Sequence, residues 1–199
     1  MASAAQLPAS PDLPAVPDRA RAGRPAATGL VIVHVGAGKG KTTAALGLMT
    51  RAWGHGLRVG VVQFLKDPGV DTGERRAARR MDIDWTAAGD GFTWDQPDPA
   101  AGRALARQGW ELAQRQGRSG QYDILILDEL TWALCLGWLD TAEVVEWLAV
   151  ERPPSLHVVV TGAWAPPELI ERADLVTEMR LVKHPFADRG QAAQAGIEY

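Results

Sequence analysis

Apolar residues along this chain gather in short continuous runs, and segments rich in helix-forming residues lie between them. The runs are rich in Val, Ile and Leu, which favours strands that are buried on both faces of a sheet. Strands are expected at residues 30–35, 58–65, 83–86, 122–129, 156–162 and 175–179, and helices at 44–53, 74–80, 99–117, 131–139, 141–150 and 166–173. This alternation predicts a three-layer α/β fold with a mostly parallel central sheet.

The two ends of the chain differ from this pattern. Residues 1–28 are rich in Ala and Pro. They bury too little apolar area to offset the ordering of their backbone, so we expect a disordered tail. Residues 182–199 are polar and rich in small residues, and we expect them to be irregular. The length of the chain fits one domain, over residues 29–199.

A glycine-rich turn follows the first strand and leads directly into a helix. It reads Gly36-Ala37-Gly38-Lys39-Gly40-Lys41-Thr42-Thr43. Glycines allow the backbone N–H groups to approach a ligand, and the positive end of the helix and the Lys41 ammonium attract anions, which indicates a phosphate-binding loop. In the usual spacing the first glycine would stand at Val35, so the loop is one residue short. It also carries an additional lysine, Lys39. We expect it to hold a polyphosphate in a different register or direction.

Two adjacent carboxylates, Asp128 and Glu129, end the strand over residues 122–129. In phosphate-loop proteins an acid at this place holds Mg²⁺, directly or through water. Mg²⁺ prefers hard oxygen ligands, so the Thr42 hydroxyl, phosphate oxygens and Asp128 form a consistent ligand set. Glu129 would point to the other side of the sheet if the strand continued.

Two large aromatic residues, Phe92 and Trp94, lie in a segment that its Gly, Asp and Pro content marks as a loop. Either they tuck under the loop as a small additional core, or they form the wall of a site for a large flat ligand. Composition alone slightly favours the first interpretation.

Composition excludes some classes of function. The net charge of −3 argues against a general nucleic-acid binder, although Arg75-Arg76 and Arg79-Arg80 form a basic cluster that could equally be a solvated helix face. The single cysteine, Cys135, stands in an apolar run, where we expect a small core residue and no disulfide. No stretch is long and apolar enough to cross a bilayer, and no secretion signal is evident, so we expect a cytoplasmic protein that does not bind membranes.

Beyond the loop, several motifs occur in an order and spacing that resemble the phosphate-loop family of ATP:corrinoid adenosyltransferases of the cobalamin pathway. A phosphate loop alone is shared by many NTPases, whereas the short loop joined to Phe-Thr-Trp and Lys-His-Pro-Phe is specific. The resemblance covers about residues 29–199. The motifs are Gly54-His55-Gly56, Val61-Val62-Gln63-Phe64, Gly91-Phe92-Thr93-Trp94, Leu127-Asp128-Glu129-Leu130, residues 173–180, Val182-Lys183-His184-Pro185-Phe186 and Gly196-Ile197-Glu198-Tyr199.

The resemblance implies a RecA-like P-loop fold and a reaction in which the Co(I) of a reduced corrinoid attacks the ribose C5′ of ATP and releases triphosphate. ATP would be held reversed, with C5′ towards the corrinoid, and Mg²⁺ or Mn²⁺ would share the phosphate charge. Lys41, Phe92 and Trp94 would be catalytic, with the aromatic side chains against the lower face of the corrin. The implied nucleotide-binding residues are Gly36, Ala37, Gly38, Lys39, Gly40, Lys41, Thr42, Thr43, Arg51, Gln63 and Glu129, and the implied metal ligands are Thr42 and Asp128.

The resemblance also implies partners and a substrate. These are an electron-donating flavoprotein reductase, a second copy of the chain in a homodimer, and a corrinoid such as cob(I)yrinic acid a,c-diamide. The sequence leaves the preferred corrinoid open, because early pathway intermediates and complete cobalamin share the reacting ring. The chain departs from the family pattern at Ala37, where the family often has a polar residue, at Ala163-Trp164, where Arg is usual after the glycine, and at Ala192, where lysine is usual. Two alternatives remain open at this point: a RecA-like kinase or NTPase, and an ATP-dependent corrinoid carrier without turnover.

Overall fold

A six-stranded sheet forms the centre of the molecule. The computed structural model describes residues 28–91 and 99–198, and within them the strand order is β3-β2-β4-β5-β1-β6. Every pairing is parallel, so the mostly parallel sheet predicted from the sequence is confirmed. The strands are β1 (Val31–Val35), β2 (Val59–Phe64), β3 (Asp84–Ala88), β4 (Ile124–Asp128), β5 (His157–Thr161) and β6 (Leu175–Glu178).

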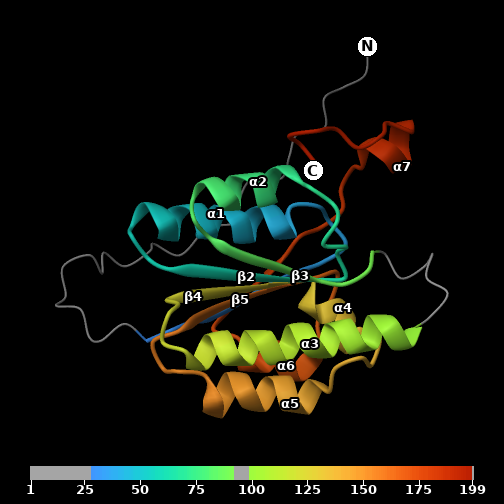
Figure 1. Ribbon diagram of the computed structural model, residues 1–199. Helices are drawn as coiled ribbons and strands as arrows, with labels where there is room; N and C mark the ends of the chain where they lie inside the picture. Colours follow the sequence, from blue (N-terminus) through green and yellow to red (C-terminus); the bar gives the residue numbers. More distant parts are fainter. Residues whose placement is uncertain (1–27, 92–98, 199) are drawn as a thin grey trace, which may run out of the picture.

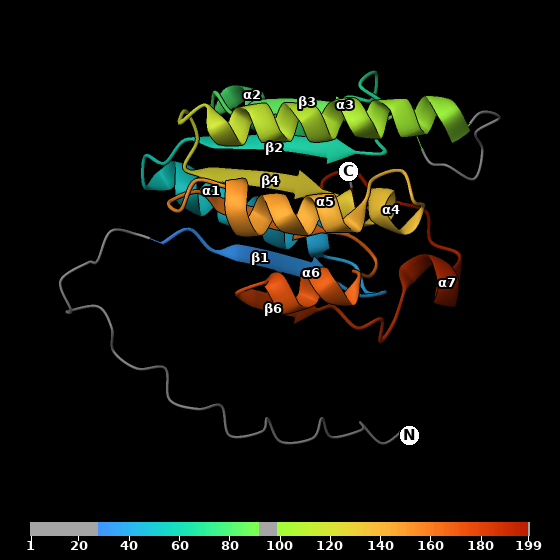
Figure 2. The same ribbon diagram turned by 90° about the horizontal axis from the view of Figure 1, so that it is seen from below.

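Helices cover both faces of this sheet and complete the three layers (Figure 1). One face carries α1 (Lys41–Gly54) and α2 (Gly73–Arg80). The opposite face carries α3 (Pro99–Arg118), α4 (Leu130–Cys135), α5 (Thr141–Glu146) and α6 (Pro167–Arg172), as Figure 2 shows from below. A short helix, α7 (Pro185–Arg189), lies apart from both layers.

Successive residues of the central strands pack into two separate hydrophobic cores, one on each face of the sheet, because side chains of a strand alternate between faces. Along β4, Ile124 and Ile126 join the core under α1, whereas Leu125 and Leu127 join the core under α3–α6. The second core contains two fully buried tryptophans on neighbouring helices, Trp110 and Trp147, whose rings meet edge to face with centroids 5.4 Å apart. Burial on both faces explains why these strands lack apolar–polar alternation.

Three details differ from the sequence-based expectations. The helix expected over 141–150 ends as α5 at Glu146 and continues as a π-helical turn over Trp147–Glu151. The end of the chain is not wholly irregular, because His184 caps α7 by accepting hydrogen bonds at Nδ1 from the N–H groups of Phe186 and Ala187. Cys135 is half-buried and so is not part of either core.

The basic cluster lies on the solvent side of α2. Arg76 and Arg79 form ion pairs of 3.2 and 2.6 Å with Asp71, and all three side chains are more than half exposed. This arrangement favours the solvated-face interpretation over a nucleic-acid site. Among the described helices, none is both long and apolar enough to cross a membrane.

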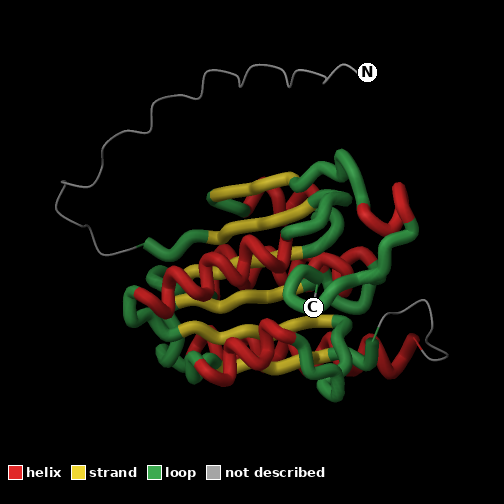
Figure 3. Tube along the Cα trace, turned by 90° about the horizontal axis from the view of Figure 1, so that it is seen from above, coloured by secondary structure: helices red, strands yellow, loops and turns green. Residues whose placement is uncertain are grey.

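The strand order determines which loops meet. All carboxyl ends of the parallel strands lie at one edge of the sheet, where open α/β sheets bind ligands. There β5 lies between β1, which precedes the phosphate loop, and β4, which ends in Asp128. Figure 3 shows the sheet from above, with the carboxyl end of the chain running across the layer that contains α1.

Candidate functional site

The phosphate loop takes a shape that its glycines make possible. Gly36 and Gly40 have φ angles of 108° and 102°, in the left-handed region that favours glycine. A Cβ at Gly36 would lie 2.4 Å from the carbonyl oxygen of Met179, and one at Gly38 would lie 2.7 Å from the same atom. The loop therefore needs glycine at these positions because the backbone after β6 packs directly against it.

Protein groups hold the loop in place without a ligand. The N–H groups of Gly36 and Gly38 donate to the carbonyls of Ala163 at 2.8 Å and Met179 at 2.7 Å. Lys41 Nζ donates to the carbonyls of Gly36 at 2.8 Å and Gly38 at 2.6 Å. The Gly38 N–H, which is among the predicted phosphate donors, thus donates to the backbone after β6 in this structure.

The first turn of α1 supplies the remaining backbone donors. Lys41, Thr42 and Thr43 open the helix after the left-handed Gly40, so their N–H groups have no acceptor within the helix. These groups, the helix dipole and the Lys41 ammonium point to an anion site at the start of α1. Burial lowers the pKa of Lys41, while Glu129 raises it.

Asp128 is the centre of a buried polar network at the end of β4. Its Oδ1 accepts hydrogen bonds from the hydroxyls of Thr42, at 2.9 Å, and Thr161, at 2.7 Å. Its Oδ2 accepts one from Gln63 Nε2 at 3.0 Å. The side chain of Asp128 is 1% exposed. The structure thus brings together the predicted residues Thr42, Gln63 and Asp128, and it adds Thr161, which the sequence analysis did not assign to the site.

This network fits a magnesium ion bound together with a nucleotide. The Thr42 hydroxyl and the Asp128 carboxylate are hard oxygen ligands 2.9 Å apart, and Thr42 also lines the cavity described below. Among the described residues, no three His, Cys, Asp or Glu side chains form a metal-binding group. Mg²⁺ commonly binds to one or two protein oxygens and completes its shell with water and phosphate oxygens. The donor set suits that mode.

Glu129 turns into the site because β4 ends at Asp128. Its φ of 60° is left-handed, and its N–H donates to the Thr161 hydroxyl at 2.9 Å. The Glu129 side chain lines the cavity described in the next paragraph, so it does not point to the opposite face of the sheet, as it would if the strand continued. Burial raises the pKa of Glu129 to about 7, with a further contribution from Asp128, and Lys41 opposes the shift.

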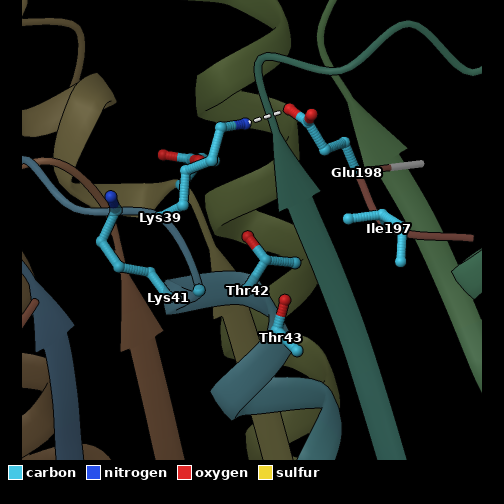
Figure 4. Close-up of a pocket in the computed structure, with 8 residues that line it drawn as sticks. Lys39, Lys41, Thr42, Thr43, Ile197 and Glu198 are labelled. Atoms are coloured by element: carbon cyan, nitrogen blue, oxygen red, sulfur yellow. Dashed lines mark hydrogen bonds and ion pairs between the residues drawn. The ribbon is translucent and has the colours of Figure 1, made fainter. Parts of the chain in front are cut away.

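A cavity of about 240 Å³ lies above the start of α1 (Figure 4). It is lined by residues of the loop, by Glu129 and by the end of the chain, namely Lys39, Gly40, Lys41, Thr42, Thr43, Glu129, Ile197 and Glu198. Lys39 Nζ forms an ion pair with Glu198, which Figure 4 shows as a dashed line. The sequence analysis quoted the last residues of the chain as a family motif, and the structure makes two of them part of the site.

A second cavity, of about 330 Å³, adjoins the first between α1, α2 and the end of the chain. The two share Thr42, Thr43, Ile197 and Glu198, and the second adds Leu46, Gly73, Glu74, Ala77 and Gly196. Its polar lining residues are Thr42, Thr43, Glu74 and Glu198, and the rest of its lining is apolar or glycine. We call these the loop cavity and the α2 cavity.

Some predicted site residues lie elsewhere. Ala37 is exposed and does not line the loop cavity. Arg51 follows Lys41 by ten residues of α1, which is about 15 Å of helix. It lines a separate groove of about 400 Å³ beside Ile32, His34 and Leu175. Arg51 is therefore not part of the lining of the loop cavity, and its contact with the nucleotide stays a prediction. Phe92 and Trp94 lie outside the described residues.

A parallel sheet with a glycine-rich loop after one strand and a buried acid after a nearby strand defines a P-loop nucleotide-binding protein of RecA-like build. Residues 27–199 match the family described as ATP:corrinoid adenosyltransferase BtuR/CobO/CobP, and the chain belongs to this family. Its activity is the transfer of an adenosyl group from ATP to a corrinoid, as the expectation from the sequence motifs stated.

Named relatives agree with this assignment. A corrinoid adenosyltransferase of Sinorhizobium sp is 44% identical over 174 residues, which cover 86% of this chain and 80% of that protein. The corrinoid adenosyltransferase of Escherichia coli K12 is 43% identical over 171 residues, 86% of each chain, and corrinoid adenosyltransferase CobA of Salmonella typhimurium is 39% identical over the same length and coverage. Among solved structures, the cytoplasmic domain of EssC has a TM-score of 0.49 and 12% identity over 82% of this chain and 34% of that chain.

Proposed function

We propose that the protein transfers the 5′-deoxyadenosyl group of ATP to the Co(I) of cob(I)yrinic acid a,c-diamide and releases intact triphosphate. The cobalt–carbon bond forms with the electron pair of Co(I), and the C5′–O bond breaks as triphosphate leaves with its electron pair. The observation that carries the proposal is the connection between the loop cavity and the α2 cavity, which gives a bound nucleotide one direction.

The direction follows from the strand order. With its triphosphate in the loop cavity, a nucleotide would extend into the α2 cavity. The far wall of that cavity is formed by residues of α2, the helix that follows β2 in the chain. β3 pairs with β2, and the loop that contains Phe92 and Trp94 begins where β3 ends. A reversed ATP would thus point its C5′ towards the carboxyl end of β3, after which the sequence continues to Phe92 and Trp94. The Glu74 carboxylate in the α2 cavity is suited to accept hydrogen bonds from ribose hydroxyls.

Residues of the loop stabilise the leaving group. Triphosphate gains negative charge as the C5′–O bond breaks, so preset donors around it lower the barrier. The N–H groups of the first turn of α1 and the Lys41 ammonium are these donors in our proposal. Lys41 would exchange the carbonyls of Gly36 and Gly38 for phosphate oxygens. Thr42 and Asp128 would hold Mg²⁺, or Mn²⁺, which supplies positive charge to the phosphates.

We also propose the roles that the family resemblance implies for the remaining parts. Phe92 and Trp94 would cover the lower face of the corrin, exclude its axial ligand and keep water from Co(I). A flavoprotein reductase would deliver the electron that reduces Co(II) to Co(I). The protein would work in the cytoplasm as a homodimer. The edge strand β6 supports a partner chain, since all four of its residues are exposed, including the apolar Leu175 and Val176.

One assay separates this reaction from its alternatives. The protein is incubated without oxygen with ATP, Mg²⁺ and chemically reduced corrinoid, while the corrinoid absorbance and the phosphate products are followed. The proposal expects an alkylated cobalt product together with intact triphosphate. ADP or orthophosphate as the product would instead indicate a kinase or NTPase. Binding of both substrates without a cobalt–carbon bond would indicate a corrinoid carrier.

A further inference from the structure

An ion pair joins the phosphate loop to the end of the chain across 159 positions of sequence. Lys39, the additional lysine of the shortened loop, pairs with Glu198. The side chain of Lys39 is 52% exposed, whereas that of Glu198 is 17% exposed, so the carboxylate is the better-held partner. A turn holds Glu198 in place, since the N–H groups of Ile197 and Glu198 both donate to the carbonyl of Gln194.

Acidic side chains offset much of the positive charge around the loop cavity. Two ammonium groups, Lys39 and Lys41, face the Glu198 carboxylate and Glu129, whose raised pKa of about 7 leaves it partly charged near neutral pH. The Lys41 ammonium group donates to two loop carbonyls. Lys39 carries the other ammonium group in the lining that a polyphosphate could recruit. A polyphosphate that approaches Lys39 meets the carboxylate of Glu198, and the two anions compete for one ammonium group.

We infer that Glu198 is a positioning residue that occupies Lys39 in the absence of polyphosphate and weakens the hold of the site on polyphosphate. The inference rests on the proposed function, because it assigns the loop cavity to the triphosphate. Any polyphosphate that recruits Lys39 must displace Glu198, so this competition weakens the hold of the site on the triphosphate product and favours its release.

The test measures the binding of inorganic triphosphate by titration calorimetry in the full-length protein at low ionic strength. The variants are Glu198→Gln, Lys39→Ala and the double variant. Glu198→Gln is expected to tighten triphosphate binding by roughly twofold to fivefold, within the range measured for solvent-accessible ion pairs. Lys39→Ala is expected to weaken binding, and adding Glu198→Gln to Lys39→Ala is expected to change it no further. The effect of Glu198→Gln should shrink as salt is added.

Glu146→Gln is the matched control, because it removes the same charge from an exposed position on α5, away from the loop. It is expected to leave triphosphate binding unchanged. The thermal midpoints of all variants show whether any change in affinity reflects a loss of fold.

The binding measurements test the role of Glu198 separately from the proposed function. Unchanged or weaker binding in folded Glu198→Gln overturns the inference and leaves the proposed function standing. Equal tightening in the presence and absence of Lys39 also overturns it, because Glu198 would then act through general repulsion. If neither ATP nor triphosphate binds to the wild-type protein, the proposed function fails first and the inference fails with it.

Discussion

Replacing Thr161 with Val removes a single hydroxyl from the centre of the buried network. This hydroxyl donates to Asp128 Oδ1 at 2.7 Å and accepts from the Glu129 N–H at 2.9 Å, and Thr161 is 0% exposed. Valine has nearly the same shape, so packing is kept while both hydrogen bonds are lost. The change therefore isolates the polar contribution of a residue that the sequence analysis did not assign to the site.

The size of the effect follows from the two bonds. Loss of a hydrogen bond to a charged acceptor costs about 1.5–3 kcal/mol, and a buried N–H without an acceptor costs about 1–3 kcal/mol. Asp128 keeps its bonds to Thr42 and Gln63, and the Glu129 N–H is only partly buried. We therefore expect the free energy of unfolding to fall by about 2.5–4 kcal/mol, in the lower half of the summed range.

Urea denaturation followed by tryptophan fluorescence measures this change. Thr161→Ser keeps the hydroxyl and should recover most of the stability, whereas Thr86→Val makes the same substitution at an exposed position of β3 and should have little effect. The Mg²⁺-dependent affinity for ATP should fall in Thr161→Val, since Asp128 is held less firmly. A free energy of unfolding for Thr161→Val within about 0.5 kcal/mol of Thr86→Val would refute the reasoning, because surface substitutions stay within that range.

Three further predictions concern the loop and the aromatic residues. Lys41→Ala should abolish turnover and weaken ATP binding, measured by calorimetry, because the variant lacks the ammonium group that we propose binds the phosphate oxygens. Gly38→Ala should abolish ATP binding in a folded protein, since its Cβ would lie 2.7 Å from the Met179 carbonyl; its control, Gly47→Ala, meets no atom within 4 Å and should stabilise α1 by about 1 kcal/mol. Unimpaired ATP binding by Gly38→Ala would contradict the proposed packing. Phe92→Ala should impair turnover more when Co(II) must be reduced on the enzyme than when Co(I) is supplied, and equal losses in the two assays would remove the role proposed for Phe92.

Local patterns determined the elements and the chemistry of the loop. The continuous apolar runs marked the four central strands β1, β2, β4 and β5, because a parallel strand covered by helices on both faces needs apolar side chains on both. The edge strands β3 and β6 are more polar and more exposed. The loop and the start of α1 were predictable as a unit, because glycine conformation and the helix N-terminus act over a few residues. Asp128 was recognisable because a carboxylate that ends an apolar run has few purely structural reasons to be there.

Only the tertiary structure decided which distant residues join the loop. Strand order placed β5 between β1 and β4, and this brought Thr161 to Asp128 and Glu129. The return of the chain brought Glu198 to Lys39, whereas the length of α1 carried Arg51 away from the loop cavity. The contacts of Thr161 and Glu198 are not written in local sequence, because they depend on how elements pack across the sheet, whereas the distance of Arg51 from the loop follows from its place along α1. The sequence by itself predicted a phosphate-binding loop, and the packing decided which distant side chains line the same cavity.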